Sequence, residues 1–139
     1  MATDDPAARW PHYREDDFII RNFAFKSGEV LPELRLHYRT MGVPRHDASG
    51  TIINGVLLLQ GNTGTGANWL RPSLADELYG PGQPLDAHRY FLIMPDAIGR
   101  GGSSKPSDGL RAHFPLGIKL TRSRYDNRLF MYHRDIPSM

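Results

Sequence analysis

The sequence contains no cysteine among its 139 residues. This absence excludes disulfide bonds, thiolate nucleophiles and zinc sites built from cysteine. No stretch approaches the ~18 consecutive apolar residues that a membrane-spanning helix needs. The first ten residues carry acids and a proline where a signal peptide has a basic start and an apolar core. We therefore expect a cytoplasmic protein with no membrane contact.

An excess of charge of one sign is also lacking. The chain has 17 Lys and Arg against 15 Asp and Glu, a formal net charge of +2. The basic residues are spread out except near the C-terminus, whereas a nucleic-acid-binding protein usually gathers them on one stripe. No spacing of His, Asp and Glu indicates a metal site, and H-x-x-x-H is absent. We expect no nucleic-acid partner, no metal and no cofactor.

Two segments with the character of strands lie near the start of the chain. Residues 1–16 are polar with interspersed aromatics and predict an N-terminal arm. Residues 17–25 are rich in Phe and Ile, which suit a strand. Residues 34–42 alternate between apolar side chains and the row of Arg35, His37 and Arg39. The two runs predict an antiparallel hairpin with one face in water, and His37 on that exposed face.

Two aliphatic runs, 55–61 and 89–96, do not alternate, which is typical of strands buried on both faces. A glycine-rich loop and a helical segment lie between them. Pro72 fits the first turn of that helix because its missing N–H would have no partner there. Strand, helix and strand in this order predict a βαβ unit. The expected fold class is α/β: a β-hairpin followed by a βαβ unit of a mostly parallel sheet, made mixed by the hairpin.

The glycine-rich loop allows three interpretations. Residues 61–68 carry the two glycines of a phosphate-binding loop, but Ala67 and Asn68 stand where Lys and Ser or Thr must be. ATP or GTP binding is therefore disfavoured. The loop could instead aim backbone N–H groups at a developing oxyanion, which needs no lysine. It could also be a tight connection that uses glycine for geometry alone. Residue types leave the last two interpretations open.

Three blocks of sequence resemble one known family. "LLLQGNTGTGANW" (57–69) is similar to the oxyanion loop of α/β-hydrolases, and "YFLIMPDAIGRGGSSKP" (90–106) is similar to the next strand and its D-x-x-G-x-G-x-S loop. "SGEVLPELRLHYRTMG" (27–42) resembles the hairpin of the homoserine O-acetyltransferase-like (MetX-like) branch. The blocks lie in the family's order. The resemblance implies the N-terminal part of an α/β-hydrolase fold, incomplete in this sequence.

The resemblance also implies roles for single residues. The backbone N–H of Asn62 would donate to the oxyanion, and Gly61 would let the chain approach the substrate closely. Thr63 and Gly64 would shape the pocket for a small-molecule acyl substrate. Asp96 is expected mainly to cap and brace its own loop, because such turns are common for aspartate. The complete enzyme would hydrolyse esters or transfer acyl groups with a Ser-His-Asp triad.

The triad itself is not found in this sequence. The family's nucleophile lies in G-x-S-x-G, where a strand turns into a helix. Residues 101–105 have the first glycine and the serine of this motif, but Lys105 replaces the last glycine. Pro106 follows, and proline does not fit the interior of a helix. None of the six histidines follows a suitable serine and acid. We expect a fragment that is inactive alone, so whether it is an enzyme stays open. The alternative is a non-catalytic remnant, or an association module that binds itself through an open sheet edge.

The expected organisation is an arm (1–16), the N-terminal part of a hydrolase domain (17–115) and an unpatterned basic tail (116–139). The tail begins where both pattern and resemblance stop, and its apolar stretch 129–132 has no evident partner strand. One hypothesis is a truncated or shifted reading frame from about Leu116. The downstream DNA tests it: the hypothesis fails if neither of the other two frames encodes a stretch such as G-x-S-x-G.

Overall fold

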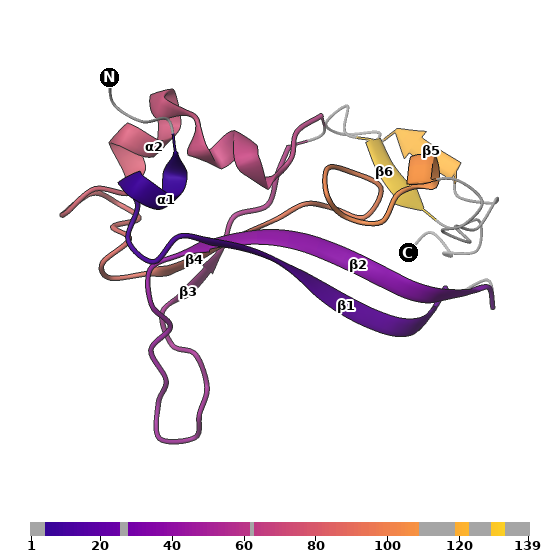
Figure 1. Cartoon of the computed structure of the whole chain (residues 1–139), viewed down its shortest axis with the longest axis horizontal. Coiled ribbons are helices and arrows are strands. Elements are labelled where there is room, and N and C mark those ends of the chain that lie inside the picture. The colour runs from indigo at the N-terminus through magenta and orange to yellow at the C-terminus, as the bar shows by residue number, and fades with distance from the viewer. Residues whose placement is uncertain (1–4, 26–27, 62, 109–118, 123–128, 133–139) are drawn as a thin grey trace.

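The computed structural model describes residues 5–25, 28–61, 63–108, 119–122 and 129–132, the last two ranges by their backbone. The elements in chain order (Figure 1) are α1 (Pro6–Arg9), β1 (Arg14–Ala24), β2 (Val30–Met41), β3 (Gly55–Leu57), the 3-10 helix η1 (Gly66–Leu70), α2 (Pro72–Leu78), β4 (Phe91–Pro95), the 3-10 helix η2 (Pro106–Asp108), β5 (Lys119–Arg122) and β6 (Leu129–Tyr132). No helix within these ranges is long and apolar enough to cross a membrane.

Strands β1 to β4 form one sheet in the order β1-β2-β4-β3. β1 and β2 pair antiparallel, and Gly28 adopts a φ of +89° between them, which glycine tolerates without strain. β2 and β4 are also antiparallel, whereas β3 and β4 are parallel, with η1 and α2 in the connection. The expected fold class is confirmed: a hairpin leads into a βαβ unit, and the sheet is mixed.

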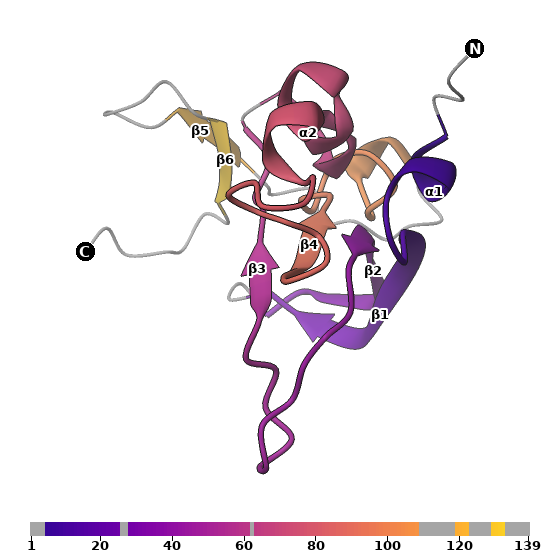
Figure 2. The same ribbon diagram turned by 90° about the vertical axis from the view of Figure 1, so that its left-hand side faces the viewer.

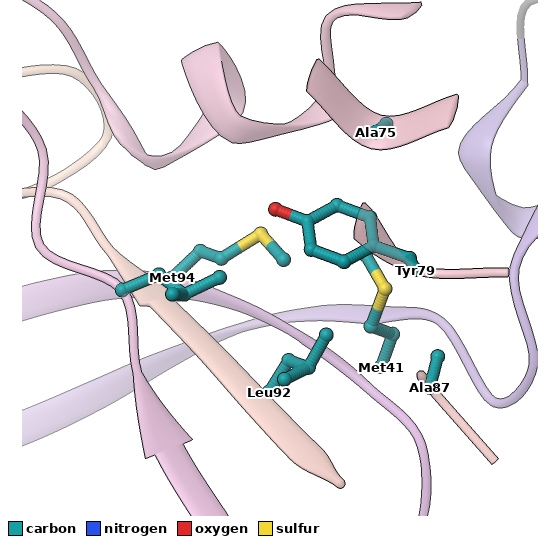
Figure 3. Packing of buried hydrophobic residues seen from close by; sticks show 7 residues of the cluster. Met41, Ala75, Tyr79, Ala87, Leu92 and Met94 are labelled. Carbon is teal, nitrogen blue, oxygen red and sulfur yellow. The ribbon is translucent and has the colours of Figure 1, made fainter. Parts of the chain in front are cut away.

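The core lies between the sheet and helix α2. Its buried members are Met41, Leu58, Ala75, Tyr79, Ala87, Leu92 and Met94. Figure 3 shows Met41 pointing toward the Tyr79 ring from below and Met94 from the left. The Tyr79 hydroxyl donates to the carbonyl oxygen of Trp69 at 3.1 Å, and burial raises the pKa of Tyr79 to about 12. A tyrosine in this position fills the core and still satisfies its polar end.

Helices α1 and α2 lie on the same side of the sheet (Figures 1 and 2). Trp10 follows α1 and packs edge-on against Tyr79, with ring centroids 5.5 Å apart. Arg9 in α1 forms an ion pair with Asp76 in α2. Trp10, one of the aromatics of the predicted arm, therefore attaches the start of the chain to the core. Strand β1 begins at Arg14, inside the residues expected to form that arm.

The run 55–61 was expected to be buried on both faces, and this prediction is wrong for the described residues. Only Gly55–Leu57 is strand, and Leu57 and Leu59 are 58% and 64% exposed. The reason is position: β3 is at the end of the sheet, and its outward side chains meet no described helix. In β4, an inner strand, Leu92 and Met94 are fully buried and the alternate residues are half-buried.

The apolar stretch 129–132 was expected to lack a partner, and this is also corrected. It forms β6, which pairs antiparallel with β5 in a separate two-stranded sheet. The partner run 119–122 carries two basic residues, which hid its strand character among the other basic residues of the tail. The rest of 116–139 lies outside the described residues, so the boundaries proposed for the three segments stay predictions.

Candidate functional site

Two loops leave the same edge of the sheet, because β3 and β4 are parallel and their carboxyl ends coincide. This edge is where open α/β sheets usually bind ligands. The loop after β3 leads to η1, and the loop after β4 leads to η2. Two hydrogen bonds join them: the Gly66 N–H donates to Asp96 Oδ1 at 2.7 Å, and the Ala97 N–H donates to Gln60 Oε1 at 3.3 Å.

Asp96 is the centre of this arrangement. Its side chain is 1% exposed and accepts two further hydrogen bonds, from Arg39 Nη1 at 3.0 Å and from the Gly102 N–H at 2.9 Å. Hydrogen bonds to an ionised group are stronger than neutral ones. The bond from Gly102 confirms that Asp96 braces its own loop. The bonds from Gly66 and Arg39 show that it also joins that loop to the one after β3 and to strand β2.

Two glycines at this edge stand where the surrounding atoms leave no room for a side chain. A Cβ on Gly66 would lie 2.4 Å from the carbonyl oxygen of Met94, and one on Gly101 would lie 2.1 Å from Asp96 Oδ2. Gly101 also has a φ of +52°, in the region that favours glycine. The pattern that the sequence shares with hydrolases therefore has a packing cause, since each glycine lets backbone approach the Asp96 carboxylate or strand β4.

The predicted site residues occupy one short turn. Gly61 and Thr63 are exposed, Gly64 is buried, and Asn62 lies outside the described residues. A Cβ on Gly61 would meet nothing within 4 Å, so the protein leaves space beside this residue. The Gly64 N–H points to the Gly61 carbonyl oxygen at 3.4 Å. The structure thus brings Gly61, Thr63 and Gly64 together, and their roles toward a substrate stay predictions.

His37 was expected on a face open to water, and this prediction is wrong. Its side chain is 19% exposed, with Nδ1 2.8 Å from Asp17 Oδ1 and Nε2 3.2 Å from Glu15 Oε2. Both acids belong to β1, whose antiparallel register brings them beside β2. The loop 99–104 covers the same face: a Cβ on Gly102 would lie 2.6 Å from the His37 ring. Alternation located the polar face correctly but could not show that a distant loop covers it.

Glu15, His37 and Tyr13 form a polar cluster, called the Glu15 cluster below. The neighbours of Glu15 shift the pKa of its carboxyl. The Tyr13 hydroxyl donates to Glu15 and lowers the pKa of that carboxyl, with smaller contributions in the same direction from Arg39 and His37. Burial and the bond to Glu15 raise the pKa of Tyr13 above its usual value. Arg39 Nε lies 3.4 Å from Glu15 Oε1. Arg39 thereby links the Glu15 cluster to the Asp96 carboxylate and the loops beyond it.

Ser103 has a structural role. It is fully buried, its hydroxyl donates to the Asp96 carbonyl oxygen at 2.7 Å, and it accepts from the His37 N–H at 2.9 Å. A serine held in this way cannot reach a substrate, which agrees with the absence of a nucleophile motif around it. Within the described ranges, no group of three or more His, Asp and Glu side chains could hold a metal ion.

Sequence reasoning missed Arg39 as the partner of Asp96 and Gln60 as the partner of Ala97. Each pair is far apart in the chain, and no local pattern signals it. The nearest signal is the alternation that placed Arg39 on the polar face of the hairpin.

No family model matches the chain. A search of curated proteins finds a probable acyltransferase of Methanothermobacter thermautotrophicus, 36% identical over 90 residues that cover 65% of this chain and 27% of the relative. A homoserine O-acetyltransferase of Thermobifida fusca is 33% identical over 105 residues, covering 70% of this chain and 27% of the relative. The chain belongs to the homoserine O-acetyltransferase-like branch of the α/β-hydrolase superfamily. It spans about a quarter of the length of these α/β-hydrolase relatives.

Solved α/β-hydrolase structures agree with the fold. An acetylester hydrolase of Corynebacterium glutamicum superposes with a TM-score of 0.53 at 25% identity, over 67% of this chain and 24% of that one. A homoserine O-acetyltransferase of Staphylococcus aureus gives a TM-score of 0.53 at 24% identity, over 76% of this chain and 30% of that one. The partial coverage fits the N-terminal part of an α/β-hydrolase. The relatives include both acyltransferases and esterases.

Proposed function

We propose that this chain supplies one half of an acyl-transfer site, the half that holds the oxyanion. In the complete enzyme a serine would attack a small acyl ester or thioester, a histidine would take its proton, and an aspartate would orient that histidine. The backbone N–H of Asn62 would donate to the oxygen that becomes negative. The bond from the acyl carbon to the alcohol or thiol would break, the leaving group would take the proton held by the histidine, and the acyl group would remain on the serine. Water or an acceptor hydroxyl such as that of homoserine would then take the acyl group and free the serine.

The observation that carries the proposal is the fixation of the loop by Asp96. A donor helps a transition state only when it is held in place before the charge develops. The carboxylate of Asp96 holds Gly66, at the far end of the loop, and Gln60 is bonded to Ala97 at the near end. The turn with Gly61 and Gly64 is thus held on both sides. The space beside Gly61 gives a substrate carbonyl room to approach the backbone.

The chain alone is expected to be inactive. Its sequence contains no G-x-S-x-G, and Ser103 is locked in the loop. Without a nucleophile, the oxyanion donors have no tetrahedral intermediate to stabilise. The chain should therefore give no hydrolysis of p-nitrophenyl acetate above the buffer rate. Turnover by the chain alone at enzymatic rates would show that inactivity is wrong.

Reconstitution tests the enzymatic role. The chain is mixed with the separately produced remainder of the Thermobifida fusca homoserine O-acetyltransferase, beyond the matched residues, after circular dichroism shows that both parts fold. Ester hydrolysis or acetyl transfer should appear only in the mixture. Dependence of acetyl-CoA consumption on added homoserine separates acyl transfer from hydrolysis. No gain of activity on mixing folded parts would favour the non-catalytic alternative.

Two variants then test Asn62 itself. Asn62→Pro removes the backbone N–H, whereas Asn62→Ala keeps it and serves as the matched control. Loss of one oxyanion donor typically lowers kcat by ~10²–10³-fold. The reconstituted enzyme should show that loss with Asn62→Pro only. Equal kcat values in the two variants would refute the donor role without touching the fold assignment.

A further inference from the structure

Asn68 belongs to the 3-10 helix η1, and its side chain folds back onto the turn 61–64. A Cβ on Gly64 would overlap Asn68 Nδ2 and lie 2.9 Å from Asn68 Cγ. The carboxamide of Asn68 thus occupies the space that a side chain at position 64 would fill. Gly64 is buried, although its neighbour Thr63 is exposed. On this side of the turn, a substrate meets the Asn68 amide instead of Gly64.

The backbone on both sides of Asn68 is held in place. Two residues before it, the Gly66 N–H donates to the buried Asp96 carboxylate at 2.7 Å. One residue after it, Trp69 Nε1 donates to the Leu59 carbonyl oxygen at 3.3 Å. A binding side chain is precise when the element that carries it is fixed before the ligand arrives. The amide of Asn68 meets this condition.

The Asn68 amide still has hydrogen bonds to give. The side chain is half-buried, and neither Nδ2 nor Oδ1 has a hydrogen-bond partner in the part of the chain that the structure describes. Nδ2 is the end that faces the turn, since Oδ1 would lie farther from a Cβ on Gly64, at 3.5 Å. Packing against Gly64 needs no polar group, because an apolar side chain of the same size would fill the space without losing hydrogen bonds to water. The amide therefore indicates a ligand.

The surroundings of the amide favour an uncharged ligand group. The sequence has no charged residue and no histidine from position 48 to position 70. The nearby carboxylate of Asp96 is 1% exposed and paired with Arg39 at 3.0 Å, so its charge is balanced inside the protein. The turn and η1 thus offer dipoles and no charges. An amide N–H in such a place suits the oxygen of an ester or thioester.

We propose that Asn68 is a substrate-binding residue whose side-chain Nδ2 donates a hydrogen bond to an oxygen of the bound acyl ester or thioester. The inference rests on the proposed function and adds a contact to it. Asn62 would act through its backbone N–H, and Asn68 acts through its side chain as soon as the substrate binds. Gly64 serves by leaving the room in which the amide lies. Loss of a bond that is equally strong in the ground state and the transition state raises KM and leaves kcat unchanged.

The test is the KM for p-nitrophenyl acetate of the reconstituted enzyme, with the remainder of the domain at saturating concentration. Asn68→Asp keeps the shape of the side chain but replaces the donor by an acceptor, and Asn68→Leu keeps nearly the same size without polar atoms. Each should raise KM by at least ~3-fold, the weight of one neutral hydrogen bond, with kcat within ~2-fold of wild type. Ala67→Asp is the matched control, because Ala67 is the exposed neighbour, and should keep the wild-type KM.

Gly64→Ala tests the contact between the turn and the amide. The new Cβ would displace the Asn68 carboxamide, so KM should rise in the wild-type background. It should not rise further in the Asn68→Ala background, because the effects of two residues in contact are not additive. Equal increases in both backgrounds would overturn the role of Gly64 as the space for the amide.

The outcomes separate this inference from the proposed function. A wild-type KM in Asn68→Asp and Asn68→Leu, or an equal rise in Ala67→Asp, would overturn the inference and leave the proposed function standing. An inactive wild-type mixture of folded parts would refute the proposed function, and the inference with it. If the remainder of the domain binds the amide, both variants weaken assembly of the two parts and keep the wild-type KM at saturation, which also overturns the inference. Circular dichroism checks each fold, and if one variant does not fold, the other decides.

Discussion

The hydrogen bonds that the Asp96 carboxylate accepts from Gly66, Arg39 and Gly102 are called the brace below. Replacing Asp96 with asparagine tests this brace most directly. Asparagine has nearly the same shape, but one oxygen becomes an NH₂ group that donates. The carboxylate now accepts from Gly66, Arg39 and Gly102, so the new donor must face at least one other donor. The Arg39 guanidinium, whose side chain is 13% exposed, loses the negative charge of its 3.0 Å partner and keeps Glu15 at 3.4 Å.

The expected loss follows from these contacts. A hydrogen bond to a charged group contributes ~1.5–3 kcal/mol, and removing one partner of a buried ion pair costs ~3–5 kcal/mol. The two figures describe overlapping contacts and do not add. Asp96→Asn should therefore lower the free energy of unfolding by ~3 kcal/mol. This is a large fraction of the ~5–15 kcal/mol typical of a domain.

Urea unfolding of the full chain, followed by tryptophan fluorescence, measures this loss. Trp69 is a suitable reporter because its Nε1 donates to the Leu59 carbonyl oxygen at 3.3 Å, beside the loop. Asp47→Asn is the matched control. Asp47 also accepts three hydrogen bonds, from the Ser49 N–H and hydroxyl and from the Thr51 N–H, but in an exposed turn. A loss in Asp96→Asn no larger than in Asp47→Asn would refute the role of burial in the brace.

Three further predictions concern stability. Glu15 has a lowered pKa in the folded chain, so its contribution to stability is present above the usual pKa of about 4.3 and is lost as the pH falls through the folded pKa. The difference in free energy of unfolding between wild type and Glu15→Gln should therefore shrink as the pH is lowered. A difference that stays constant with pH would contradict this. Tyr79 has its pKa raised to about 12, so its contribution is present below ~10 and is lost as the pH rises toward 12; Tyr79→Phe should cost ~1 kcal/mol at neutral pH, less in alkali, by urea unfolding at each pH. Gly66→Ala should lower the free energy of unfolding by ~1–3 kcal/mol, because the new Cβ would meet a backbone carbonyl of β4. Gly61→Ala should change it by less than ~0.5 kcal/mol, because there is space beside Gly61. Equal thermal midpoints of the two variants would contradict the packing argument.

The order of the elements could be predicted because it rests on local patterns. Alternation in 34–42 gave β2, the aliphatic runs gave β3 and β4, and Pro72 stands at the first position of α2 as expected. These patterns show whether a segment has apolar side chains on one face or on both faces. They cannot report whether the covering element is present, so the exposure of Leu57 was not foreseen.

For the candidate site, the sequence predicted a location, whose role toward a substrate stays a prediction. The resemblance pointed to the turn at Gly61, and the parallel strands place that turn at the carboxyl ends of the strands, where open α/β sheets usually bind ligands. The brace was not predictable in full, because Arg39, Gly66 and Asp96 come from three separate elements. The prediction that His37 is exposed failed for the same reason. The two acids that contact His37 come from β1, and the loop that covers it follows β4. Pairings between distant residues depend on packing, which has no short-range signature.

The brace also has a consequence for the order in which a protein is made. Every described contact that fixes the loop ends comes from residues between Arg39 and Gly102. A chain leaves the ribosome N-terminus first, and its parts begin to fold in that order. The proposed oxyanion side of the site can therefore take its final shape before a later part of a longer chain has folded. A serine nucleophile supplied later would meet a binding surface that is already formed.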